Sequence, residues 1–385
     1  MRIGISGSYG GLNLGDEAIL AVLLGELGQR GVGDEYVIFS RERDFTQKRY
    51  PSARVVAVRE IDRTAAHAEV ARLDALVLGG GGVLFDGEAT TFLREVEIAQ
   101  ELGIPTLALA VGAGPLAEPP ERWVVGQAVG AMTSVSVRSR RSASLLRDCG
   151  VGSPVEVVAD PAWLLPAHAP APVPLEALGL PEDRQLIAVS VREPGPAAPV
   201  LFSVDYHTYL AAGIRHAIRR YDAHVVFAAM EHGDVEHAHR VAEQVGVPGG
   251  CTVLGRPGDP LDVFQVLRHT RLALGLRFHF LLLAASAGVP IVVPPLVEKL
   301  DGLADELGLP AEHRPEAQIP SLQSALDAAW HCPAAAREAV AVAVRERVRS
   351  ARRGVDLLMA ELLAVPERPR ASTRAPAGDV LHSSL

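Results

Sequence analysis

Cysteine, aromatic side chains and net positive charge are all scarce or missing in this sequence of 385 residues. The three cysteines, Cys149, Cys251 and Cys332, form no CxxC pair, which argues against a disulfide framework or a structural zinc site. Aromatic residues make up 5%, too few for the base-stacking platforms of a single-strand binder. A formal net charge of -9 repels a phosphate backbone, so we expect no nucleic-acid partner.

Signals for a membrane or for secretion are missing as well. The most apolar stretch, residues 272–297, contains Arg277, His279 and three prolines, so we do not expect it to span a bilayer. The chain starts with Met-Arg-Ile-Gly-Ile and runs directly into a predicted strand, without a basic segment followed by an apolar one. These absences predict a cytoplasmic protein. They leave open peripheral contact with the inner face of the membrane, and also a homo-oligomeric state.

Short apolar segments alternate with helical patterns along the whole chain. The predicted strands are Arg2–Ser6, Tyr36–Ser40, Arg54–Val58, Leu73–Leu78, Thr106–Val111, Ser134–Arg138, Val155–Val158, Leu186–Val191, His224–Ala228, Leu272–Leu274 and Ile291–Val293. Helices are predicted from about Gly15 and over Thr90–Leu102, Ser142–Cys149, Tyr206–Tyr221, Val235–Val245 and Phe278–Ala287. This alternation predicts an α/β fold with two doubly wound, Rossmann-like domains. Ligands of such sheets bind at the carboxyl ends of the strands, and here also in the cleft between the domains.

Proline marks the expected domain boundary. Residues 166–174 contain four prolines, which predicts a stiff, extended linker. We therefore predict an N-terminal domain over residues 1–165 on the acceptor side and a C-terminal domain over residues 175–365 on the donor side. A long helix from about Ala334 to Ala364 closes the second domain. Residues 366–385, rich in Pro, Arg, Ser and Ala, are predicted to be disordered.

Three glycine-containing motifs follow predicted strands. Residues 10–17 read Gly-Gly-Leu-Asn-Leu-Gly-Asp-Glu, and residues 79–82 are four glycines followed by Val-Leu-Phe-Asp. Glycines allow a close approach of backbone to ligand, and a helix N-terminus offers free N–H groups to an anion. Two other readings stay open: Asp16 and Glu17 could only complement the helix dipole, and the four glycines could serve tight packing.

The third motif reads Gly-Leu-Arg-Phe-His over residues 275–279 and opens an apolar helix. Cations such as Arg277 and His279 are unfavourable beside the positive end of a helix unless an anion joins them. The pattern therefore indicates an anion site, although His279 could instead be a structural histidine.

Together these motifs resemble the polysaccharide pyruvyltransferase family over about residues 3–309. The resemblance rests on Asn-x-Gly-Asp-Glu-Ala-x-Leu at 13–20, the glycine block before Asp86, Val137-Arg138-Ser139 with Ser142 and Leu145, Asp160-Pro161, Arg277-x-His279, and Gly288-Val289-Pro290 with Lys299 downstream. The chain departs from the family at Leu276, where Met is frequent, and at Pro295 or Leu296, where a Tyr often stands in a Tyr-x-x-Lys segment.

The resemblance implies a fold similar to the glycosyltransferase-B architecture. It also implies phosphoenolpyruvate as the donor and a pyruvate ketal on a sugar as the product. The acceptor would be a glycan, a glycolipid or a sugar-containing small molecule. Phosphoenolpyruvate is a co-substrate, and we expect no further cofactor. No spacing of His, Cys and carboxylates in the sequence demands a metal.

The chemistry of phosphoenolpyruvate suggests roles for individual residues. Its carboxylate and phosphate call for cations, and arginine matches such oxyanions best. The candidate substrate-binding residues are Arg138, Arg192, Arg277, Lys299, Asn13, Gly81, Gly82, Glu231 and Asp234. His279 is the candidate proton donor to the enol carbon, because imidazole titrates near neutral pH. Asp16 and Glu17 are candidates for activating acceptor hydroxyls. Arg138 and Arg192 could instead be surface charges.

Two other functions fit the same sequence. A nucleotide-sugar glycosyltransferase of this architecture would also use helix N-termini and basic residues. A repurposed family member could modify a small-molecule natural product. A dinucleotide-dependent oxidoreductase fits poorly, because the first turn lacks the full GxGxxG register and Ser40 stands where an acidic residue would end the second strand.

Overall fold

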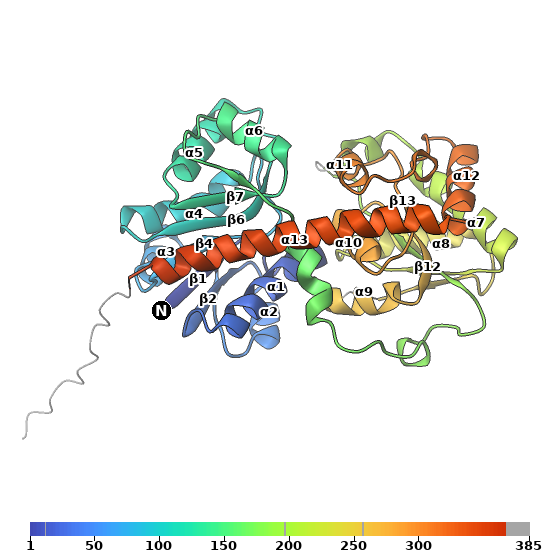
Figure 1. Ribbon diagram of the computed structural model, residues 1–385, viewed down its shortest axis with the longest axis horizontal. Helices are drawn as coiled ribbons and strands as arrows, with labels where there is room; N and C mark the ends of the chain where they lie inside the picture. Colours follow the sequence, from blue (N-terminus) through green and yellow to red (C-terminus); the bar gives the residue numbers. More distant parts are fainter. Residues whose placement is uncertain (12, 196–197, 256–257, 367–385) are drawn as a thin grey trace, which may run out of the picture.

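The computed structural model describes residues 1–11, 13–195, 198–255 and 258–366. Within them the strands form two parallel sheets, which confirms the predicted α/β class (Figure 1). The first sheet has the order β3 (Arg54–Ala57), β2 (Glu35–Ser40), β1 (Arg2–Ser6), β4 (Ala75–Leu78), β6 (Thr106–Ala113), β7 (Ser134–Val137) and β8 (Glu156–Val157), with β5 (Gly82–Leu84) paired to β6. The second has the order β11 (Cys251–Val253), β10 (His224–Phe227), β9 (Leu186–Ser190), β12 (Thr270–Gly275) and β13 (Ile291–Val292).

Helices connect the strands of both sheets. We call the first sheet with its helices the first lobe, and the second sheet with its helices the second lobe. The helices of the first lobe are α1 (Leu14–Arg30), α2 (Arg43–Arg49), α3 (Arg63–Val70), α4 (Ala89–Glu101), α5 (Pro119–Gly130) and α6 (Arg140–Asp148). Those of the second lobe are α7 (Tyr206–Tyr221), α8 (Asp234–Val245), α9 (Pro260–Leu267), α10 (Phe278–Ser286), α11 (Lys299–Glu306) and α12 (Ile319–Trp330). Short 3-10 turns cover Pro161–His168 (η1), Glu176–Leu178 (η2), Pro199–Phe202 (η3) and Ala311–His313 (η4).

Both sheets reverse their direction of winding at an inner strand pair. In the first lobe the chain moves outward from β1 to β3 and then returns to start again at β4, on the other side of β1. In the second lobe the same reversal lies between β9 and β12. Every residue of β4 and of β9 is buried, as expected for inner strands covered by helices on both faces. Ligands of doubly wound sheets bind beyond the carboxyl ends of such strand pairs.

Helix α1 begins where the two lobes meet. Asn13 is its N-cap and accepts a hydrogen bond from the Gly15 backbone N–H, and Gly31 ends the helix in the left-handed conformation. The Leu14 backbone N–H donates to the carbonyl of Met230 in the second lobe, at 2.9 Å. The first turn of α1 is therefore held against the second lobe.

The prediction of an extended linker is wrong for its first residues. Residues 161–168 form the 3-10 turn η1, so residues 166–168 are not extended. Asp160 caps this turn, Pro161 presets its first φ angle, and burial of Trp163 and Leu165 holds it in place. The proposed boundary between residues 165 and 175 stays a prediction, and residues 367–385 lie outside the described part of the chain.

Helix α13 spans Ala334–Ala364, the bounds that the sequence predicts, and it lies along both lobes (Figure 1). Its first half contacts the second lobe, where Arg347 lies 3.8 Å from Glu306. Its second half contacts the first lobe, where Arg352 donates to Glu26 at 2.5 Å. One continuous apolar core joins α1, η1, α10 and α13. None of the helices in the described ranges combines the length and apolar character needed to cross a membrane.

Candidate functional site

Asp160 lies at the centre of the predicted site residues. It follows β8, is 3% exposed, and its Oδ1 accepts from the Ala162 backbone N–H at 3.0 Å. Its Oδ2 accepts from Arg138 Nη1 at 2.9 Å and lies 3.3 Å from His279 Nε2. Burial alone would raise the pKa of Asp160, but His279 and Arg138 hold it well below its usual range. One carboxylate of the first lobe thus orients two predicted site residues, one from each lobe.

His279 joins the second lobe to the start of α1. Its ring packs against Gly15, where an added Cβ would lie 1.8 Å from His279 Nδ1. Only glycine leaves room for the ring there. Gly15 of the Asn-x-Gly-Asp-Glu motif is therefore required by His279 of the Arg-x-His motif. The two residues are 264 positions apart in the sequence.

Asp16 lies beside this pair and is 7% exposed. Burial raises its pKa, and the neighbouring His279 and Arg138 oppose that rise. An added Cβ at Gly81 would lie 2.1 Å from Asp16 Oδ1, and Gly81 has a φ of +64°, which other residues rarely adopt. At Gly82 an added Cβ would lie 3.5 Å from Arg138 Nη2. Gly81 thus makes room for the Asp16 side chain, whereas the distance at Gly82 is that of an ordinary contact with Arg138.

Glu17 is placed differently from Asp16. It is fully buried, and its Oε1 accepts from the Gly10 backbone N–H at 2.8 Å. Burial raises the pKa of Glu17 to about 7, although the Gly10 hydrogen bond opposes this. In this conformation its carboxylate has no access to an acceptor hydroxyl, so its predicted catalytic role would require the Gly10 turn to move.

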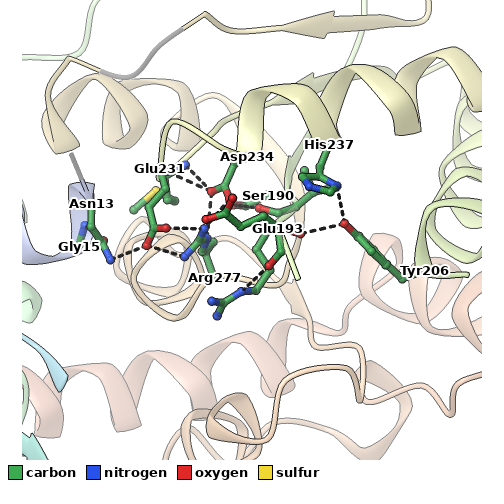
Figure 2. Close-up of polar contacts among 12 residues, drawn as sticks. Asn13, Gly15, Ser190, Glu193, Tyr206, Glu231, Asp234, His237 and Arg277 are labelled. Atoms are coloured by element: carbon green, nitrogen blue, oxygen red, sulfur yellow. Dashed lines mark hydrogen bonds and ion pairs between the residues drawn. The ribbon is translucent and has the colours of Figure 1, made fainter. Parts of the chain in front are cut away.

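Arg277 is bound by two carboxylates of the second lobe (Figure 2). Its Nη1 and Nη2 donate to Glu231 at 2.6 and 2.9 Å, and its Nε donates to Asp234 Oδ2 at 2.9 Å. Asn13 Nδ2 donates to Glu231 Oε1 at 2.7 Å from the first lobe. Asp234 is fully buried and also accepts from the backbone N–H of Met230 and Glu231. The first evident task of Arg277 is therefore to position Glu231 and Asp234.

The positive charges of Arg192 and Lys299 are less fully balanced by carboxylates than that of Arg277. Arg192 is 6% exposed, and its buried Nη1 has no hydrogen-bond partner among the described residues. Burial and the neighbouring Arg277 lower the pKa of Arg192 to about 10. Lys299, at the start of α11, reaches solvent. Even so, loss of part of its hydration and the nearby Arg192, Arg138 and Arg277 lower its pKa to about 7.

Three contributors to this region are not among the sequence candidates. Asp160 could have been found, because an Asp-Pro pair directly after a strand is a strong cap signal. Tyr206 and His237 carry no such signal. The Tyr206 hydroxyl donates to the Arg192 carbonyl at 3.0 Å and lies 2.7 Å from His237 Nδ1. This pair holds the backbone that carries Arg192.

Comparison with known proteins gives a sequence match and several structural ones. A family model described as Polysaccharide pyruvyl transferase matches residues 13–293. No curated protein matches the chain. The fold is similar to the UDP-GlcNAc 2-epimerase from Methanocaldococcus jannaschii, with a TM-score of 0.68, 12% identity, and coverage of 94% of this chain and 100% of that chain.

Two further solved structures show the same architecture. The UDP-GlcNAc 2-epimerase from Neisseria meningitidis bound to UDP-GlcNAc has a TM-score of 0.64 and 12% identity, and the match covers 94% of this chain and 100% of that chain. A glycosyltransferase from Rickettsia africae ESF-5 has a TM-score of 0.61 and 11% identity, with coverage of 95% and 99%. At such identities the likeness establishes the fold alone, which is the predicted glycosyltransferase-B-like architecture.

Proposed function

This chain belongs to the polysaccharide pyruvyl transferase family, and from that premise we propose that it transfers the pyruvyl group of phosphoenolpyruvate to two hydroxyls of a sugar. The product is a cyclic pyruvate ketal, and inorganic phosphate is released. The proposal assigns the donor to the region of Arg192, Lys299 and Arg138, and the sugar to the side of Asp16 and Glu231.

The observation that carries this proposal is a group of four neighbouring cations, two of which, Arg192 and Lys299, have a lowered pKa. Arg192, Arg138 and Arg277 all contribute to the low pKa of Lys299, and Arg277 lowers that of Arg192. Two of these four cations, Arg138 and Arg277, already pair with carboxylates. Gathering like charges around an unpartnered buried Arg192 nitrogen is costly unless an anion completes the site. Phosphoenolpyruvate, with its phosphate and carboxylate, supplies such charge.

The proposed reaction begins with a proton transfer from His279 to C3 of the enol. Positive charge then develops at C2, and one sugar hydroxyl adds there. The C2–O bond to phosphate breaks, and phosphate leaves with the electron pair. The second hydroxyl adds to C2 and closes the ring. The two hydroxyls lose two protons in total. C3 takes up one proton and the released phosphate takes the other, so the charges balance.

Each neighbour of His279 has a part in this scheme. Asp160 faces Nε2, so Nδ1 is the nitrogen left to donate. Since Nδ1 packs on Gly15, the enol carbon reaches it only when α1 and α10 move slightly apart. Asp16, whose pKa is raised by burial, is suited to accept a hydroxyl proton. Arg277 acts by positioning Glu231, which is suited to orient the second hydroxyl.

The test is turnover with phosphoenolpyruvate and a panel of sugars, read as phosphate release and as a product heavier by pyruvate minus water. We expect His279→Ala to abolish release while binding of phosphoenolpyruvate persists. The exposed His239 on α8 gives the matched control, and His239→Ala should retain wild-type turnover. Wild-type turnover by His279→Ala would remove His279 from the role of acid.

A nucleotide-sugar glycosyltransferase remains the competing function, because the fold is shared with enzymes that bind UDP-sugars. It predicts protection against unfolding by a nucleotide sugar and none by phosphoenolpyruvate. A family member acting on a small-molecule natural product would instead keep the same donor and differ only in the acceptor that yields product.

A further inference from the structure

A cationic pocket lies on the first lobe, at the carboxyl ends of β1 and β2 and beside the residues that follow β3. The cavity has a volume of about 200 Å³. Its walls come from these strand ends and from one face of α4, and its main lining side chains are Arg41, Arg59, Arg94, Phe92 and Glu95. None of them is used in the mechanism above.

Two guanidinium groups that line this pocket converge on one carboxylate oxygen beside it. Arg41 Nη2 and Arg59 Nη2 lie 3.3 and 2.9 Å from the same Oε2 of Glu88. Both groups also lie over the Phe92 ring, at 5.1 and 5.8 Å from its centroid. The ring and the carboxylate thus hold two arginines side by side with a net charge of +1.

One hydrogen-bond donor at the pocket has no acceptor among the described residues. Arg41 Nε is buried and has no hydrogen-bond partner in the described part of the chain. Burial and the neighbouring Arg59 lower the pKa of Arg41, which indicates an incompletely compensated charge. The planar carboxylate of Glu88 therefore does not satisfy all the donors that meet here.

The other two charged residues that line the pocket, Arg94 and Glu95, form one of its walls. Arg94 pairs with the buried Glu95 at 2.7 Å and also donates to the carbonyls of Ile61 and Val58. Their charges cancel each other, and their hydrogen bonds are internal. The free binding capacity of the pocket therefore belongs to Arg41 and Arg59.

The pocket lies close to the proposed reaction site. Gly7 lines it, one residue before Ser8, whose side chain hydrogen-bonds to Asp16. The charges of Asp16 and Glu231 both act on Arg41. A molecule held at Arg41 and Arg59 would therefore extend toward the two carboxylates that we assign to the acceptor hydroxyls.

We propose that this pocket binds a phosphate ester of the acceptor, so that the substrate is a phosphorylated or diphosphate-linked sugar and not a neutral glycan. This inference rests on the proposed function. A phosphate monoester offers three outer oxygens and a diphosphate bridge offers four, enough to accept from Arg41 Nε, Arg41 Nη2 and Arg59 Nη2 together, whereas a carboxylate offers only two. Glu88 holds the two arginines in position until the phosphate replaces it.

Calorimetric binding of pyrophosphate to the full chain, at saturating phosphoenolpyruvate, tests the pocket itself. Arg59→Gln should weaken pyrophosphate binding by about tenfold, the effect of losing one charge-assisted hydrogen bond. Glu88→Gln should strengthen it, because the competing carboxylate charge is removed. Arg63→Gln is the matched control, since Arg63 pairs with Glu97 and Glu101 on the outside of the same lobe and should leave affinity unchanged. Equal affinities for wild type, Arg59→Gln and Glu88→Gln would overturn the inference.

Turnover with three forms of one sugar separates this inference from the proposed function. The sugar is supplied unmodified, as a nucleoside diphosphate sugar, and as a lipid diphosphate sugar. A preference for either diphosphate form that Arg59→Gln abolishes supports the inference and identifies the source of the phosphate. Equal use of the unmodified sugar overturns the inference and leaves the proposed function intact. Pyrophosphate binding that depends on Arg59, without pyruvyl transfer to any form, overturns the proposed function and leaves the anion pocket.

Discussion

Gly15→Ala tests the contact between the lobes most directly. The added methyl group would lie 1.8 Å from His279 Nδ1 and 2.5 Å from its Cγ, closer than any real contact allows. Helix propensity alone would favour Ala over Gly by about 0.5–1 kcal/mol. Overpacking a buried contact costs about 1–3 kcal/mol. We therefore expect no net gain in stability, and a displaced His279 ring.

The same helix offers a matched control. Gly28 also lies in α1, and an added Cβ there meets no atom within 4 Å. Gly28→Ala should raise the free energy of unfolding by about 0.5–1 kcal/mol. The difference between the two variants then isolates the steric cost at His279, about 1–3 kcal/mol. Urea unfolding of both variants measures it.

The effect on catalysis should be larger than the effect on stability. A displacement of about 1 Å at a reacting group lowers the rate by about 100-fold. Phosphate release from phosphoenolpyruvate should therefore fall by about that factor in Gly15→Ala and stay at the wild-type level in Gly28→Ala. If both variants were equally active and equally stabilised, the close packing of Gly15 on His279 would not exist in solution and the argument for a shared site would fail.

Two pH-dependent predictions follow from buried or crowded charges. The pKa of Glu17 is raised from 4.5 to about 7, so its contribution to stability is present below pH 4.5 and is lost as the pH rises through 7. Glu17→Gln keeps an acceptor for the Gly10 N–H and should remove about 3 kcal/mol of this pH dependence, measured by urea unfolding between pH 4.5 and 8. An unchanged slope would contradict the burial argument. The pKa of Lys299 is lowered to about 7, so binding of phosphoenolpyruvate should weaken as the pH rises above 7. Lys299→Met should weaken binding by about tenfold at pH 6 and flatten that pH profile in calorimetry, and a profile as steep as that of the wild type would exclude Lys299 as the titrating group.

Sequence patterns predicted the fold well because parallel strands are marked locally. Leu186–Ser190, for example, is an apolar run with a helix following it, and this local pattern is sufficient to place it in a buried sheet. The long helix α13 has no internal proline and could be bounded from its flanks. The three-residue strand β11 was missed, because so short a segment has no measurable periodicity.

The site was predicted less completely, because its partners come from distant parts of the chain. Sequence could propose that Arg277 and His279 stand at a helix start. It could not reveal that Glu231 and Asp234 bind Arg277 from 46 and 43 residues away. Nor could it reveal that Asp160 reaches His279 across 119 residues. Which cations are paired, and which are left for a ligand, depends on these tertiary contacts.

Helix α13 constrains how the two lobes can move relative to each other. A continuous helix keeps a fixed length, and here its first half is tied to the second lobe through Arg347 and its second half to the first lobe through Arg352. The two halves of the molecule therefore cannot slide apart along that axis. The motion that α13 leaves to the two lobes is a rotation about the axis of this helix. Such a rotation would separate Gly15 from His279 while α13 keeps its contacts with both lobes.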